Sequence, residues 1–171
     1  MSDWLDRLDR GLAKGETVLV VLALGVMISL AAVQFVLRKF FDTGFEWADI
    51  MVRQMVLWLG FIGGSLATHE GRHIAIDAVG KLLAPKKAAA LRSATFFAAA
   101  GVTSVMVYAA IQFLRSEIDS GSKIFGEVPS WPIQAIIPVC FVTITFHFVV
   151  AARHELLVAR GRREPKPEVP V

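Results

Sequence analysis

Four long apolar stretches, separated by polar segments, dominate the pattern along this chain. A helix rises about 1.5 Å per residue, so about 20 apolar residues span the hydrocarbon core of a membrane, which is roughly 30 Å thick. The pattern therefore predicts an all-α membrane protein whose transmembrane domain, residues 17–152, contains four helices. The four stretches are Thr17 to Leu37, Ile50 to Thr68, Ser93 to Leu114 and Trp131 to Ala152.

Composition supports a membrane protein. Of the 171 residues, 55% are hydrophobic and 19% are charged, whereas soluble domains have about 45–50% and about 25%. The first stretch lacks the short apolar run and small-residue cleavage site of a signal peptide. We therefore expect it to remain in the protein as a signal-anchor helix.

Lys and Arg residues are distributed unevenly between the two sides that four spans define. Thirteen fall before the first span, in the loop between the second and third spans, and in the tail. The two other loops hold four: Arg38, Lys39, Arg115 and Lys123. Because cytoplasmic segments carry the excess of Lys and Arg, we expect both termini in the cytoplasm. Membrane lipid is the natural partner of these charges, and we expect no nucleic acid partner.

The segments outside the spans are expected to lie at the membrane surface or to be disordered. Residues 1–16 are predicted as an amphipathic interfacial helix because apolar and basic residues take different faces. A second interfacial segment is predicted over residues 74–84, and residues 153–171 as a basic, largely disordered cytoplasmic tail. The apolar face of the first helix comprises Trp4, Leu5, Leu8 and Leu12.

One short motif suggests an enzyme. The sequence His69-Glu70-Gly71-Arg72-His73 fits H-E-x-x-H, in which two histidines on one helical face bind zinc and the glutamate acts as general base. A membrane zinc metalloprotease is therefore one alternative function. Candidate third ligands on the same side are Asp77, His147, His154 and Glu155.

Gly71 favours a different interpretation of this motif. Glycine is the residue that most often ends a helix in the left-handed conformation, and an end there would move His73 off the face of His69. We therefore expect a cytoplasmic interface motif that ends the second helix, and no catalytic residue, metal or cofactor. Its residues are Glu70, Gly71, Arg72, His73 and Asp77.

The spans contain few groups that could line a transport path. Arg53 lies near the start of the second span and His147 lies in the fourth, where a hydrogen-bonded packing role is expected. Gly60 and Gly64 form a GxxxG pattern, which lets helices approach closely in lipid. Cys140 is the only cysteine, so no disulfide can form within the chain. These features favour an accessory subunit that packs against a partner, with a free-standing membrane scaffold as another alternative.

Several runs of residues resemble the small membrane subunit, the DctQ-like small permease, of the tripartite ATP-independent periplasmic (TRAP) transporters. In the first half they are Phe45-Glu46-Trp47-Ala48-Asp49, Arg53, Val56 to Gly64 and Glu70 to Asp77. In the second half they are Val128-Pro129-Ser130-Trp131 and Pro138. The resemblance covers about residues 15–155. Asp49 departs from it, because a glutamate is the more usual residue there.

The resemblance implies a scaffold in a transport complex and no enzyme activity. In this family a periplasmic substrate-binding protein (P) delivers a substrate, usually an organic acid, to the membrane. The large membrane subunit (M) carries the substrate and sodium sites, and the small (Q) subunit braces it. We therefore expect secondary active, sodium-driven carboxylate uptake in the bacterial inner (cytoplasmic) membrane, with this multi-pass chain as scaffold.

Candidate contact residues follow from the motifs. Asp49 and Arg53, spaced i,i+4, are expected to pair at the start of the second helix or to meet the partner. The loop from Lys123 to Trp131 is a possible docking edge for the binding protein. The full set of partner-interface candidates is Trp47, Asp49, Arg53, Trp58, Gly60, Gly64, Lys123 and Trp131.

Overall fold

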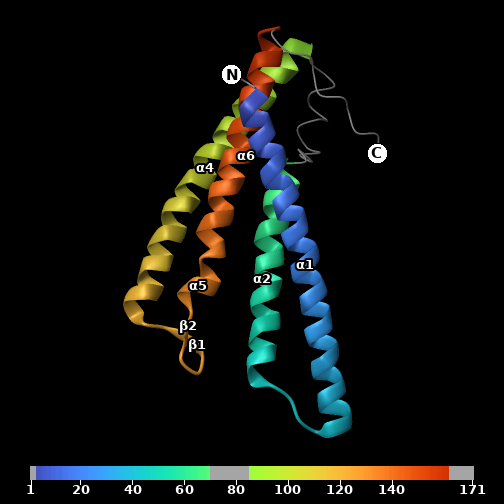
Figure 1. Cartoon of the computed structure of the whole chain (residues 1–171). Helices are drawn as coiled ribbons and strands as arrows, with labels where there is room; N and C mark the ends of the chain where they lie inside the picture. The colour runs from blue at the N-terminus through green and yellow to red at the C-terminus, as the bar shows by residue number, and fades with distance from the viewer. Residues whose placement is uncertain (1–2, 70–84, 162–171) are drawn as a thin grey trace.

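The computed structural model describes residues 3–69 and 85–161 and is almost entirely helical (Figure 1). Two short strands and a one-turn helix lie between the third and fourth long helices. The helices are α1 (Asp3–Phe41), α2 (Glu46–His69), α4 (Pro85–Ser120), α5 (Trp131–Gln134) and α6 (Ile136–Ala159). The strands are β1 (Lys123–Phe125) and β2 (Val128–Pro129).

The long helices form an open row and not a closed bundle. Helix α4 packs against α6, α6 packs against α2, and α2 packs against α1 (Figure 1). The start of α1, the end of α2, the start of α4 and the end of α6 come together, and we call this the terminal end. The opposite, loop end carries residues 42–45 and 121–130. An open row leaves α1 and α4 with large faces that no other described helix covers.

Four helices are long and apolar enough to cross a membrane, which confirms the predicted fold class. Their outward side chains are apolar and exposed, as with Val21 and Val102 at 63% and 64%. Burial is greatest in α6, which has neighbours on two sides. A buried apolar core between α4 and α6 comprises Phe96, Ala100, Phe148 and Ala152.

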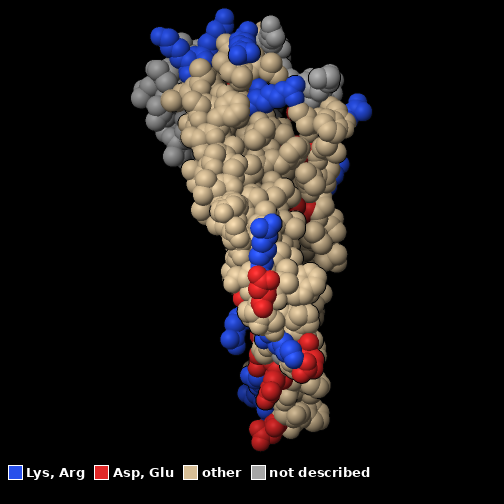
Figure 2. Space-filling model, turned by 90° about the vertical axis from the view of Figure 1, so that its left-hand side faces the viewer, with Lys and Arg blue, Asp and Glu red and all other residues tan. Residues whose placement is uncertain are grey.

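Charged side chains lie mainly toward the two ends of the molecule. Figure 2, which looks at the molecule from the side of α4, shows Lys and Arg gathered at the terminal end and both signs of charge toward the loop end. A broad uncharged zone covers the helices next to the terminal end. This distribution fits helices whose middle parts lie in hydrocarbon.

The observed helices extend beyond the predicted spans. Helix α1 is continuous over 39 residues, so the expected interfacial helix and the first span are one element, roughly 58 Å long at about 1.5 Å per residue. Helix α6 continues to Ala159, so the first residues of the expected disordered tail are helical. Helix α4 begins at Pro85, because proline suits the first turn of a helix. The segment 74–84, the residues from Glu70 to His73, and the tail from residue 162 lie outside the described residues.

The loop end contains a small hairpin that the apolar pattern does not predict. Strands β1 and β2 pair antiparallel, with Lys123 opposite Pro129. Gly121 ends α4 with φ of 61°, and Gly126 turns the hairpin with φ of 53°. Both values lie in the left-handed region that glycine adopts without strain. These glycines let the chain reverse between α4 and α5.

Candidate functional site: a buried polar cluster at the terminal end

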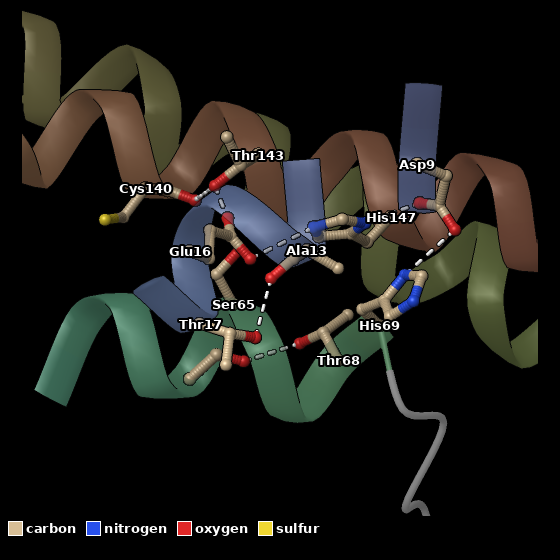
Figure 3. A network of polar contacts seen from close by, with 11 residues as sticks. Asp9, Ala13, Glu16, Thr17, Ser65, Thr68, His69, Cys140, Thr143 and His147 are labelled. Atoms are coloured by element: carbon tan, nitrogen blue, oxygen red, sulfur yellow. Dashed lines mark hydrogen bonds and ion pairs between the residues drawn. The ribbon is translucent and has the colours of Figure 1, made fainter. Parts of the chain in front are cut away.

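Asp9 of α1 joins two histidines from different helices. Its Oδ1 atom lies 2.5 Å from Nδ1 of His147 on α6, and its Oδ2 atom lies 2.9 Å from Nδ1 of His69 at the end of α2 (Figure 3). Asp9 and His147 are 8% and 2% exposed. One carboxylate thus connects α1, α2 and α6 in a site that solvent hardly reaches.

Glu16, two helical turns after Asp9, contacts the other side of His147. Its Oε1 atom accepts a hydrogen bond of 2.7 Å from the Ser65 hydroxyl, and that hydroxyl lies 2.9 Å from the Thr143 hydroxyl. Its Oε2 atom lies 3.4 Å from Nε2 of His147, and neither of these two atoms has a hydrogen-bond partner among the described residues. The imidazole of His147 therefore lies between two carboxylates (Figure 3).

Helical spacing explains how three helices build this cluster. Residues three or four positions apart share a helical face. On α1 that face contains Asp9, Ala13 and Glu16, all buried. The other two helices each supply an i,i+4 pair, Ser65 with His69 and Thr143 with His147. We call the six polar residues the terminal cluster: Asp9, Glu16, Ser65, His69, Thr143 and His147.

Most of the terminal cluster was not expected from the sequence. Asp9 and Glu16 belong to the segment that was predicted to lie flat on the membrane surface, yet they face the neighbouring helices. The available signal was their spacing, with Ala13 between them, on a face separate from the exposed Arg7, Arg10 and Lys14. His147 does have the expected hydrogen-bonded packing role.

The terminal cluster contains a group of side chains able to hold a metal ion. One donor atom from each of Asp9, His69 and His147 lies within 4.8 Å of the other two. His69 belongs to the H-E-x-x-H pattern, but its ring contacts come from α1 and α6. Two of the candidate third ligands lie elsewhere, since Glu155 accepts a hydrogen bond of 3.0 Å from Arg92 and His154 lies beside Glu155.

A second set of polar contacts joins α1 to α2 at the loop end. Gln34, which is 4% exposed, donates from Nε2 to the Phe45 carbonyl at 2.7 Å and accepts from the Phe45 amide at 3.0 Å. Asp49 forms an ion pair with Arg38 and accepts a longer hydrogen bond of 3.3 Å from Gln34. Gln34, Arg38, Phe45 and Asp49 are called the loop-end contacts below.

The expected pairing of Asp49 with Arg53 is wrong. Asp49 turns toward Arg38 on α1, and these two described residues of α2 form no ion pair with each other. Arg53 is exposed on the surface of α2. Asp49 therefore contacts the preceding helix and not its own.

The other predicted contact residues divide into internal and open positions. Trp58 donates its indole N–H to the Ile133 carbonyl at 2.9 Å, so its polar group serves the fold. Lys123 forms an ion pair with Glu127 across the hairpin. The exposed candidates are Trp47, Gly60, Gly64, Lys123 and Trp131.

One comparison with known proteins places most of the chain in one family. A family model described as tripartite ATP-independent periplasmic transporters, DctQ component, matches residues 18–157. This match runs from the first apolar stretch to the last turn of α6. Searches of curated proteins and of solved structures found no match.

Proposed function

The chain belongs to the DctQ component family of the tripartite ATP-independent periplasmic (TRAP) transporters, and from this premise we propose that it braces the large membrane subunit of a sodium-driven transporter for organic acids. Membership makes the chain a transporter component and not an enzyme. The H-E-x-x-H pattern therefore does not identify a protease. A free-standing scaffold is also set aside, because members of this family work with a large subunit and a substrate-binding protein.

The open row of helices is the observation that carries the bracing role. Helix α1 presents an open apolar face whose residues include Val21, Leu22, Val26 and Leu30. On α2, Gly60 and Gly64 are exposed, and a Cβ atom at either position would meet nothing within 4 Å. In lipid, helices associate mainly through close packing at small residues. These faces are therefore suited to the helices of a large subunit.

The proposed orientation puts the terminal end in the cytoplasm and the loop end in the periplasm of a bacterial inner membrane. Its support is the excess of Lys and Arg on the side of the two termini. A membrane-impermeant thiol reagent applied to intact cells should label a cysteine at Ser122 and not one at Val169, in a Cys140→Ala background. The reverse labelling would exclude this orientation.

The hairpin at the loop end is the proposed docking edge for the substrate-binding protein. Lys123 and Glu127 are 50% and 90% exposed in their side chains, and Trp131 is exposed just after the hairpin. Tryptophan is enriched at protein interfaces, and charged side chains suit their polar rim. A Lys123→Glu variant should weaken binding of the loaded binding protein to the assembled membrane complex and leave assembly intact. Unchanged binding would show that the hairpin is not part of the docking surface.

Co-purification tests the bracing role directly. The full chain and its large subunit are expressed together, and the large subunit is captured through a tag on this chain. We expect stable capture by the wild-type chain and a loss of about tenfold, equivalent to about 1.4 kcal/mol, with Gly60→Leu. Gly101→Leu is the matched control, because Gly101 on α4 is also exposed and open. Failure of the wild-type chain to capture the large subunit would contradict the bracing role, whereas equal capture by Gly60→Leu would move the contact to another face.

A further inference from the structure

We propose that Asp9, His69 and His147 form a binding site for a zinc ion that fastens α1, α2 and α6 together at the terminal end. The proposed site is structural and independent of the transport role. It rests on donor atoms from three different helices that meet in one buried place.

The donor atoms suit zinc by type and by separation. Imidazole nitrogen and carboxylate oxygen are common zinc ligands, with bonds of about 2.0–2.2 Å, whereas magnesium and calcium prefer oxygen alone. Tetrahedral ligands at that bond length lie roughly 3.4 Å apart. Asp9 now contacts the two histidines at 2.5 and 2.9 Å, and all three donor atoms lie within 4.8 Å of one another. Shifts of about 1 Å in these side chains would therefore admit the ion.

The surroundings of His147 match those of a metal-binding histidine. Such a histidine almost always donates its other ring N–H to a carboxylate, carbonyl or water, which fixes the ring. With Nδ1 of His147 on the ion, Nε2–H points to Oε2 of Glu16, 3.4 Å away and without another hydrogen-bond partner. Glu16 is itself held by Ser65. The second ring nitrogen therefore already faces the group that would orient the ligand.

Charge balance favours a divalent cation at this place. The two acidic residues Asp9 and Glu16 are both almost fully buried. Buried charges are costly unless they are paired. A zinc ion with two neutral imidazoles balances both carboxylates. Without a metal, the carboxylates must take up protons themselves or be balanced by protons on the imidazoles. A proton on each imidazole would put two positive rings with centroids 5.1 Å apart next to each other.

The site would join two helices that otherwise make little contact with each other. Helix α1 packs along α2 but reaches α6 through few contacts, at the terminal end (Figure 1). Metal bonds from Asp9 and His147 would join α1 to α6 there, and His69 would fix the end of α2. This arrangement uses one histidine of the H-E-x-x-H pattern and needs no catalytic water.

Metal analysis of the purified full chain tests the proposal. The chain carries a tag without histidines, is loaded with zinc in detergent, and is dialysed before its metal content is measured by mass spectrometry. We expect about one zinc ion per chain, as for a single site, and a loss of at least about tenfold in zinc affinity with Asp9→Asn or His69→Gln. His154→Gln is the matched control on α6 and should retain the metal. Glu16→Gln should bind zinc about 10–100-fold more weakly, because it removes the carboxylate that orients His147.

A stability measurement on the wild-type chain tests the proposal even if the variants fold poorly. Zinc should raise the melting temperature of the wild-type chain, and a chelator should reverse the rise. Two results would overturn the proposal. In one, the wild-type chain takes up no zinc; in the other, His69→Gln and the wild type hold the same amount of zinc. In the first case the terminal cluster is a hydrogen-bonded Asp–His group, and in the second the zinc is adventitious.

Discussion

The terminal cluster and the loop-end contacts both tie α1 to its neighbours through a carboxylate, but they differ in burial and in reach. Asp9 is almost fully buried and joins three helices, whereas the Asp49 and Arg38 side chains are 39% and 58% exposed and join two. Breaking a buried ion pair costs about 3–5 kcal/mol, and an exposed one contributes about 0–1 kcal/mol. The comparison indicates that α1 is held to its neighbours more strongly at the terminal end than at the loop end.

The largest effect is expected from Asp9→Ala. This change leaves His69 and His147 without their shared carboxylate and should lower the free energy of unfolding by about 3–5 kcal/mol. Denaturant unfolding in mixed micelles provides the measurement. Asp119→Ala, at an exposed position on α4, is the control and should change stability by less than about 0.5 kcal/mol. Equal effects of the two substitutions would remove the distinction between buried and exposed carboxylates.

An intermediate effect is expected from Gln34→Leu at the loop end. Leucine has a similar size but leaves the amide and carbonyl of Phe45 without the partners they now have, at a cost of about 1–3 kcal/mol. Gln34→Glu keeps an acceptor for the Phe45 amide and should cost less. Hydrogen exchange at that amide, measured beside global stability, would locate the change. Unaltered exchange in Gln34→Leu would show that Gln34 does not hold this connection.

The smallest effect is expected from the exposed ion pair. A double-mutant cycle with Arg38→Ala and Asp49→Ala should give a coupling energy of about 0–1 kcal/mol that falls as salt is added. The corresponding cycle with Arg53→Ala and Asp49→Ala should give no coupling, since those residues do not pair. A coupling energy above about 2 kcal/mol for Arg38 and Asp49 would mean that the loop-end contacts stabilise α1 about as much as the terminal cluster does.

The sequence predicts the helices well because a transmembrane span is a local property of about 20 residues. The prediction divided α1 at Thr17, because the sequence changes there from amphipathic to wholly apolar. That change does not break a helix, so α1 is continuous. The prediction also misses the hairpin, because β1 and β2 have three and two residues and no alternating pattern. The one signal for the hairpin in the sequence is Gly126, a glycine at the position where the chain turns with positive φ.

The two polar regions were harder to predict because their partners are distant in sequence. The pairing of Asp49 with Arg53 was suggested by i,i+4 spacing, yet the actual partner is 11 residues earlier, on another helix. The contact between Asp9 and His147 spans 138 residues. Local spacing identifies which side chains share a face, but tertiary packing decides which faces meet. The roles of Gly60, Gly64 and the hairpin in partner binding stay predictions.

Sodium-driven uptake by the reconstituted components tests the central claim most directly. Liposomes receive the large subunit, this chain, or both, and a binding protein loaded with a labelled organic acid is added outside with an inward sodium gradient. The account predicts uptake only where both membrane subunits are present, because under the proposed function this chain braces the large subunit and does not transport by itself. Uptake by the large subunit alone at the full rate, or by this chain alone above empty liposomes, would contradict it.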